Sequence, residues 1–203
     1  MKKTIKKGLI TFIITLNVCA SFAQKGLIGV LSGQDTTTIE QNKTWLNINA
    51  GMSMSKSPKF VYLFPMSSSV SVHHVNKKRN LIKVKAAISH GTQGFSNFAQ
   101  NGKELNLMTG KIFCLDDISV ELYYGIGLVN GIKRGDVIPQ SRQDFWDDFT
   151  KQYIKEKYMA VGIPLEVLFK GKTYGCSFSA NLNKELSYVG MKVSIHIGQE
   201  YRK

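Results

Sequence analysis

The sequence predicts an all-β fold, an eight-stranded antiparallel up-and-down transmembrane β-barrel, and three observations support this prediction. Apolar and polar residues alternate with period two along most of the chain, which is the pattern of strands with one apolar face. After residue 23 no apolar run is long enough for a membrane helix, so a chain that enters a membrane must close into a barrel. Short and long connections also alternate, as the two rims of an outer-membrane barrel require.

The expected strands follow from the register of their apolar residues. In the clearest one, Val189, Met191, Val193, Ile195 and Ile197 alternate with glycine and polar residues. Most of the runs reach the roughly 9–11 residues that a tilted membrane strand needs. The alternation leaves open which face points inward, because a soluble barrel buries its apolar register and a membrane barrel exposes it. The strands are expected at 45–56, 60–75, 81–90, 104–113, 118–131, 158–169, 173–183 and 187–198.

The connections between these strands differ in length in a regular way. The links after the second, fourth and sixth strands are short, whereas 91–103 and 132–157, after the third and fifth strands, are long. Short turns on one rim and long loops on the other are typical of outer-membrane barrels. An even number of strands also lets the sheet close without free edges.

The N-terminus has the features of a secretory signal peptide. Lysines at positions 2, 3, 6 and 7 precede an apolar run, Leu9–Val18, and small residues at Ser21 and Ala23 fit a cleavage site after Ala23. We expect a signal peptide at 1–23, an N-terminal arm at 24–44 and the barrel at 45–203. Cys19 leaves a lipoprotein signal as the alternative, although Leu16-Asn17-Val18 lacks the small residue expected before such a cysteine.

The mature chain is expected to be basic. Removing the four lysines of the signal, which contains no acid, lowers the formal net charge from +13 to +9. For an exported chain the expected partners are anionic lipid head groups, lipopolysaccharide phosphates or acidic glycans, and not nucleic acid. The alternative is a solvated basic surface with no partner.

Five charged residues fall in the polar register of the expected strands, and we predict that they form a charge cluster in the lumen. An ion-paired cluster is the favoured interpretation, because buried charges must be paired. Two carboxylates on neighbouring strands could instead form a general acid/base pair. The cluster comprises Lys83, Lys85, Glu121, Glu166 and Lys192.

The longest expected loop has a helical pattern. At 139–158, Phe145, Phe149 and Tyr153 recur every four residues, with Trp146 beside them. We predict a short amphipathic helix in this third outer loop. Its aromatic face either packs over the barrel mouth or contacts an outside partner.

No catalytic, metal or cofactor motif is present in the sequence. The histidines match no metal signature, so no cofactor is expected. Ser71 and His73, like Ser194 and His196, share the polar register, but no third group to orient the histidine is apparent. The protein is therefore predicted not to be an enzyme.

The alternating segments, the Ala23-Gln24 junction and the strand–turn–strand region from Tyr174 to Gly198 resemble the small outer-membrane β-barrel proteins of Gram-negative bacteria with a Bacteroidetes-type envelope. The resemblance implies an outer-membrane location, contact with membrane lipid and lipopolysaccharide, and insertion by the barrel-assembly machinery. One departure is the C-terminus, where Tyr201 is followed by two basic residues instead of ending the chain.

The functional expectation is a non-enzymatic envelope protein with a structural or surface-interaction role. An eight-stranded barrel is filled by its own side chains, so an open pore is not expected. Two alternatives remain at this point. One is a soluble lipocalin-like barrel that binds an apolar ligand, and the other is a lipid A-modifying barrel enzyme with a Ser–His pair.

Overall fold

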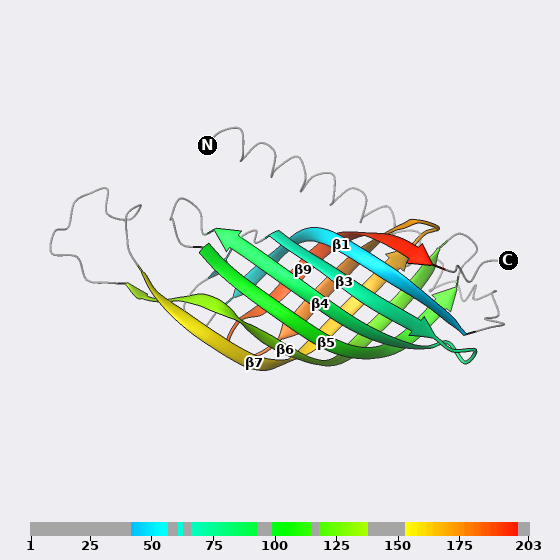
Figure 1. Cartoon of the computed structure of the whole chain (residues 1–203), viewed down its shortest axis with the longest axis horizontal. Coiled ribbons are helices and arrows are strands. Elements are labelled where there is room, and N and C mark those ends of the chain that lie inside the picture. Colours follow the sequence, from blue (N-terminus) through cyan, green and yellow to red (C-terminus); the bar gives the residue numbers. More distant parts are fainter. Residues whose placement is uncertain are drawn as a thin grey trace, which may run out of the picture.

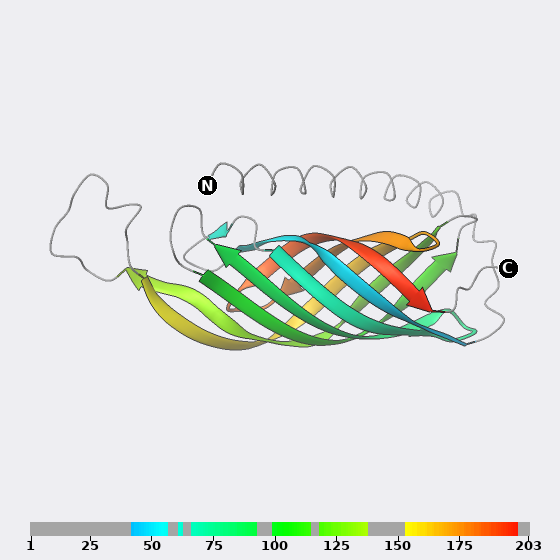
Figure 2. The same ribbon diagram turned by 45° about the horizontal axis from the view of Figure 1, so that its top comes forward.

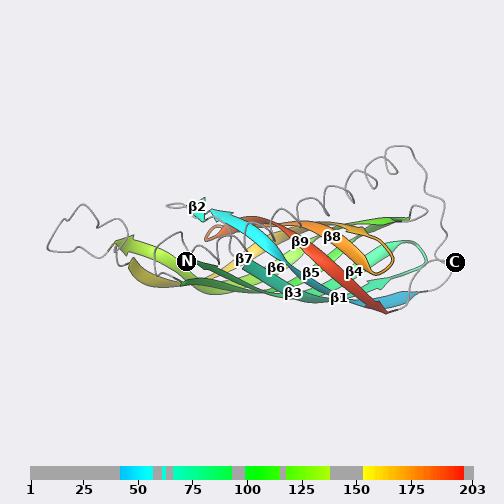
Figure 3. The same ribbon diagram turned by 90° about the horizontal axis from the view of Figure 1, so that it is seen from above.

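The computed structural model describes residues 42–56, 61–62, 66–92, 99–114, 118–137 and 153–198, which form one closed antiparallel barrel (Figure 1). The β1–β9 pairing closes the sheet, and β2 only adds two residues to the tip of β1 (Figure 3). The strands are β1 (Lys43–Lys56), β2 (Val61–Tyr62), β3 (Met66–Val75), β4 (Asn80–Thr92), β5 (Ala99–Cys114), β6 (Ser119–Val137), β7 (Tyr153–Lys170), β8 (Tyr174–Leu182) and β9 (Ser187–Gly198).

The eight long strands confirm the predicted fold class. Each pairs with its neighbour in sequence, and the last, β9, lies beside the first, β1 (Figure 2). The short links after β3, β5 and β7 gather on one rim, and the long links after β4 and β6 belong to the other. In the described ranges no helix is both long and apolar enough to cross a membrane.

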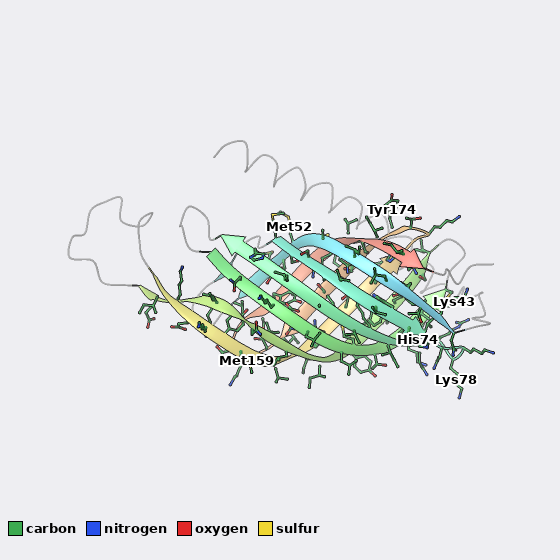
Figure 4. All side chains as sticks on the ribbon, viewed as in Figure 1. Lys43, Met52, His74, Lys78, Met159 and Tyr174 are labelled. Carbon is green, nitrogen blue, oxygen red and sulfur yellow. The ribbon has the colours of Figure 1, made fainter. Side chains whose placement is uncertain are left out.

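The apolar register faces outward along the barrel. Met159, Val161 and Tyr124 are 61–67% exposed, whereas the alternating residues of the same strands are buried. The labelled Met159, Met52 and Tyr174 lie on the outer surface in Figure 4. The lipocalin-like alternative is therefore wrong, because such a barrel would bury this register.

The strands differ most from the sequence prediction in three places. The expected strand 60–75 is divided into β2 and β3, and β5 begins five residues earlier than predicted, at Ala99. The β6–β7 hairpin is also longer, since Arg134 pairs with Lys155 and Val137 with Tyr153. This extension projects beyond the other strands (Figure 1).

An apolar cluster lies at each end of the polar interior. The cluster at the loop end consists of Val129, Tyr158 and Leu186. The larger cluster, at the short-turn end, consists of Trp45, Val75, Leu81, Met108, Ile112, Cys114, Tyr123 and Leu168. Between them the inward residues are polar or small, so the charged side chains described next are enclosed by the barrel wall and by these clusters.

Candidate functional site

Three of the five residues predicted as a lumen charge cluster form one buried ion-pair group. Lys83 donates a 2.7 Å hydrogen bond to Oε1 of Glu166, and Lys85 donates one of 2.7 Å to Oε2 of the same carboxylate. The two lysines are two residues apart on β4, so both point inward, and their side chains are at most 2% exposed. One carboxylate therefore holds two ammonium groups.

A second buried group is centred on His73 of β3. The Ser71 hydroxyl lies 2.8 Å from Nε2 of His73, and the Tyr123 hydroxyl lies 2.7 Å from Nδ1. Tyr123 donates a 2.6 Å hydrogen bond to Oε2 of Glu121, which lies 3.5 Å from Nδ1 of His73. The Nζ atom of Lys83 lies 4.6 Å from the centre of the Tyr123 ring, so the two groups are in contact.

The two carboxylates of the predicted cluster have different partners. In the β6–β7 register Glu166 is opposite Tyr123, and Glu121 precedes Tyr123 by two residues on β6. Each carboxylate accepts hydrogen bonds from its own donors, which is unlike an acid/base pair that shares one proton. Lys192 lies on β9, two strands from Glu166, opposite Ser177 and 1% exposed.

Ser71, His73 and Glu121 follow one another in the order of a hydrolase triad. The sequence indicated the first two residues but not the third group, because Glu121 and Tyr123 come from a distant strand. All three triad-like residues are at most 1% exposed. A nucleophile must reach its substrate, so in this closed interior the arrangement acts as a hydrogen-bond relay that fixes the side chains.

At the loop end of the barrel, two acids pair with one inward lysine. Nζ of Lys133 lies 2.5 Å from Oε2 of Glu185 and 3.8 Å from Oε2 of Glu156. The hydrogen bond from Lys133 lowers the pKa of Glu185 below its ordinary value. Lys155 and Lys157 lie on either side of Glu156 in β7. Their side chains therefore point to the opposite face of the strand, and both are exposed.

The exposed lysines begin where the outward apolar register ends. On β5, Lys103 comes next to Leu105 in that register, and on β7, Lys157 comes next to Met159. Strands β5, β6 and β7 are neighbours, so these positions belong to one part of the outer surface. We call Lys103, Lys155 and Lys157 the outer lysine patch.

The aromatic residues predicted for a loop helix are only partly described. Phe145, Trp146 and Phe149 lie outside the described residues, and so does most of the expected helix. Tyr153 begins β7, so the helical prediction is wrong for residues 153–158. Pairing with β6 overrides the local aromatic spacing there, since the strand pairing gives the backbone cross-strand hydrogen-bond partners.

Within the described part of the chain, no group of three or more His, Cys, Asp or Glu side chains is placed to hold a metal ion.

Two solved structures show how the barrel compares with known proteins. Ail, the attachment invasion locus protein of Yersinia pestis, superposes with a TM-score of 0.50 at 10% identity, over 78% of this chain and 98% of that chain. Neisserial surface protein A superposes with a TM-score of 0.52 at 8% identity, over 79% of this chain and 100% of that chain. At such identities the similarity shows the fold alone, that of a small outer-membrane β-barrel.

No protein-family model matches the chain, and no curated protein sequence matches it.

Proposed function

We propose that this protein is a non-enzymatic outer-membrane barrel whose outer lysine patch binds lipopolysaccharide phosphates. Its signal peptide is cleaved after Ala23, and the barrel-assembly machinery inserts the mature chain. The observation that carries the proposal is at the loop end, where Glu156 and Glu185 pair with the inward Lys133 and three lysines, Lys103, Lys155 and Lys157, face outward.

The outward apolar band supports the membrane location. Side chains such as Val161 and Ile126 are 60–63% exposed, and exposing this much apolar surface to water is unfavourable. Lipid would cover the band, and the strand lengths suit a membrane. The apolar clusters at both ends of the interior support a closed barrel and not an open pore.

The position of the outer lysine patch supports an anionic lipid partner. Residues directly above an apolar band meet the polar head groups of the outer leaflet. A lysine near an anionic membrane surface contributes roughly 1 kcal/mol to binding. The neighbouring acids Glu156 and Glu185 pair with Lys133, which reduces their repulsion of a phosphate.

A structural neighbour offers further support for an anionic ligand. Ail, whose fold is similar, has been crystallised in complex with the heparin analogue sucrose octasulfate. That complex shows that a small barrel of this fold can bind a polyanion. The lysines of the outer patch are the candidates for that role in this protein.

The test compares lipopolysaccharide binding by two triple variants of the refolded barrel. Replacing Lys103, Lys155 and Lys157 with glutamine should weaken binding to lipopolysaccharide micelles by roughly 150-fold, if each lysine contributes about 1 kcal/mol. Dephosphorylated lipopolysaccharide should bind the parent barrel as weakly as intact lipopolysaccharide binds this triple variant. The control replaces three exposed lysines of the short-turn end, Lys77, Lys78 and Lys172.

Each variant must first show the faster gel migration of an unboiled closed barrel. Equal affinity for the outer-patch variant and the control variant would disprove the phosphate contact. Recovery of the protein from the soluble periplasm alone, with no difference between boiled and unboiled samples, would disprove the membrane location.

A further inference from the structure

One wall of the interior carries buried polar atoms that have no hydrogen-bond partner. The wall consists of β8, β9 and β1, whose inward side chains are mostly short. These atoms include both amide atoms of Asn47, the hydroxyls of Ser177 and Ser194, and both ring nitrogens of His196. All four residues are 9% exposed or less. Burial without a partner is unfavourable for such groups, so their concentration on one wall indicates a bound polar species.

Two of these atoms converge over a glycine. A Cβ atom at Gly175 would lie 2.7 Å from Nε2 of His196 and 3.2 Å from Oγ of Ser194. Gly175 is opposite Ser194 in the β8–β9 register, and Asn47 is opposite His196 in the β1–β9 register. The imidazole and the hydroxyl therefore meet at one place on the inner wall, beside the backbone carbonyl of Phe169, and Asn47 lies on the adjoining strand.

Buried lysines lie on both sides of this place. Lys170 is opposite Gly175 in the β7–β8 register and is 4% exposed. Its Nζ atom lies 4.3 Å from the centre of the Trp45 ring, and Trp45 is two residues from Asn47 on the same face of β1. On the other side, Lys192 is two residues from the converging serine of β9 and 1% exposed.

Among the described side chains that are less than a tenth exposed, the charges do not balance. Lysines outnumber glutamates by one in this set, which leaves out the histidines and the partly exposed group of Lys133, Glu156 and Glu185. A low-dielectric interior favours a compensating anion, because an unbalanced buried charge is costly. The buried charged residues are four lysines, Lys83, Lys85, Lys170 and Lys192, and three glutamates, Glu104, Glu121 and Glu166.

We propose that Asn47, Ser194 and His196 bind a small monovalent inorganic anion, such as chloride, inside the barrel. The amide, the hydroxyl and one imidazole nitrogen can each donate a hydrogen bond to it. Water would satisfy the same donors but would bring no negative charge to a wall that carries Lys170 and Lys192. The anion site is independent of the outer lysine patch and of any lipid contact.

Trp45 provides a spectroscopic probe of the site. The chain has two tryptophans, so Trp146→Phe leaves Trp45 as the only one. Bromide, a heavy halide that quenches indole fluorescence, replaces gluconate at constant ionic strength in the detergent-refolded protein. Site binding predicts quenching that saturates, with occupancy of about 90% at ten times the dissociation constant.

A matched pair of serine variants tests the location of the site. Ser194→Ala should raise the bromide concentration for half-saturation at least tenfold or abolish saturation. Ser67→Ala should leave the response unchanged, although Ser67 is also a buried serine whose hydroxyl has no partner, because it lies at the loop end of β3. The gel migration of unboiled samples confirms that both variants are folded.

A second measurement needs no variant. The temperature at which the fast-migrating band disappears should be higher in chloride than in gluconate, because a ligand that binds only the folded barrel stabilises it. Saturable quenching lost in Ser194→Ala, together with this shift, supports the anion site. Quenching that is linear and equal in all proteins, with equal temperatures in both salts, would overturn it and indicate that water alone occupies the wall.

Discussion

Glu166 is the side chain whose replacement should destabilise the barrel most. Its two carboxylate oxygens each accept a 2.7 Å hydrogen bond from a buried lysine, Lys83 or Lys85. In Glu166→Gln the amide oxygen can still accept one of these bonds, but the amide nitrogen then faces the second ammonium. Two buried cations lose their counter-ion, and removal of one partner of a buried ion pair costs about 3–5 kcal/mol. We expect a loss in the upper half of that range.

Two controls separate the lost ion pair from other effects. Replacing the whole group, as Lys83→Met, Lys85→Met and Glu166→Leu together, removes the charges along with their partner. Such replacements are neutral or stabilise by about 1–4 kcal/mol in other proteins. Glu185→Gln removes a partly exposed ion pair, so it should cost less than about 1 kcal/mol.

The assay is a urea titration of the barrel refolded in detergent micelles. The fraction of fast-migrating band at each urea concentration gives the free energy of unfolding if the transition is two-state and reversible. The reasoning is refuted if Glu166→Gln is within about 1 kcal/mol of the parent. It is equally refuted if the apolar triple variant is as unstable as the single variant.

Four further outcomes are expected. Val161→Lys should cost about 2–4 kcal/mol in the same titration, because it places a cation on the lipid-facing surface. Tyr123→Phe removes a hydroxyl that bonds two buried groups, so it should cost about 1–3 kcal/mol, and a neutral effect would contradict the relay. Arg79→Gly should raise stability by up to about 1 kcal/mol, measured as a higher urea midpoint, because this residue has a φ of 62°. The lowered pKa of Glu185 means that its pair with Lys133 contributes stability above the unfolded pKa and loses it as pH falls through the folded pKa. The pH dependence of stability should therefore decrease in Glu185→Gln, most clearly at acidic pH and low salt.

The strands were predictable because lipid acts on every one of them in the same way. Each outward residue between the rims is exposed to the same apolar solvent, so the period-two pattern is strong within the band. Beyond the band this selection ends. The hairpin residues from Ile132 to Val137 and from Tyr153 to Lys157 mix charged and apolar residues, and strand pairing keeps them extended without a period-two pattern. The alternation of apolar and polar residues therefore did not predict this extension.

The direction of the faces was not predictable from alternation alone. A two-residue period is the same whichever register faces inward, and the five charged residues of the predicted cluster occupy a single register in both architectures. The structure decides because it buries that register, for example Lys83 and Glu121, each 0% exposed. The pairing of each lysine with a particular glutamate was not predictable either. It depends on how far neighbouring strands are shifted along one another, because this shift fixes the height at which β4 and β7 face each other across the interior.

Tyr123 carries a signal that alternation alone does not use. It is an aromatic residue in the polar register of its strand, where the neighbours in that register include Ser119, Gly125 and Gly127. A large side chain at such a position must reach across the interior, where its hydroxyl needs a partner. That reasoning would have indicated a contact with the opposite wall, although not the identity of His73 as the partner.

The buried charges also explain how the barrel keeps its register. If β4 slipped by one residue, Lys83 and Lys85 would face lipid, and each would cost about 2–4 kcal/mol there. The slip would also separate both lysines from Glu166 and turn the apolar residues Ile82 and Val84 into the interior. These losses all favour the same pairing, so the polar interior specifies the register of a strand whose outer face is uniformly apolar. A lumen filled only with small apolar residues would fit the same space but would distinguish the two registers less strongly. The apolar triple variant proposed above should therefore be stable but less specific, with a second refolded species visible beside the native band.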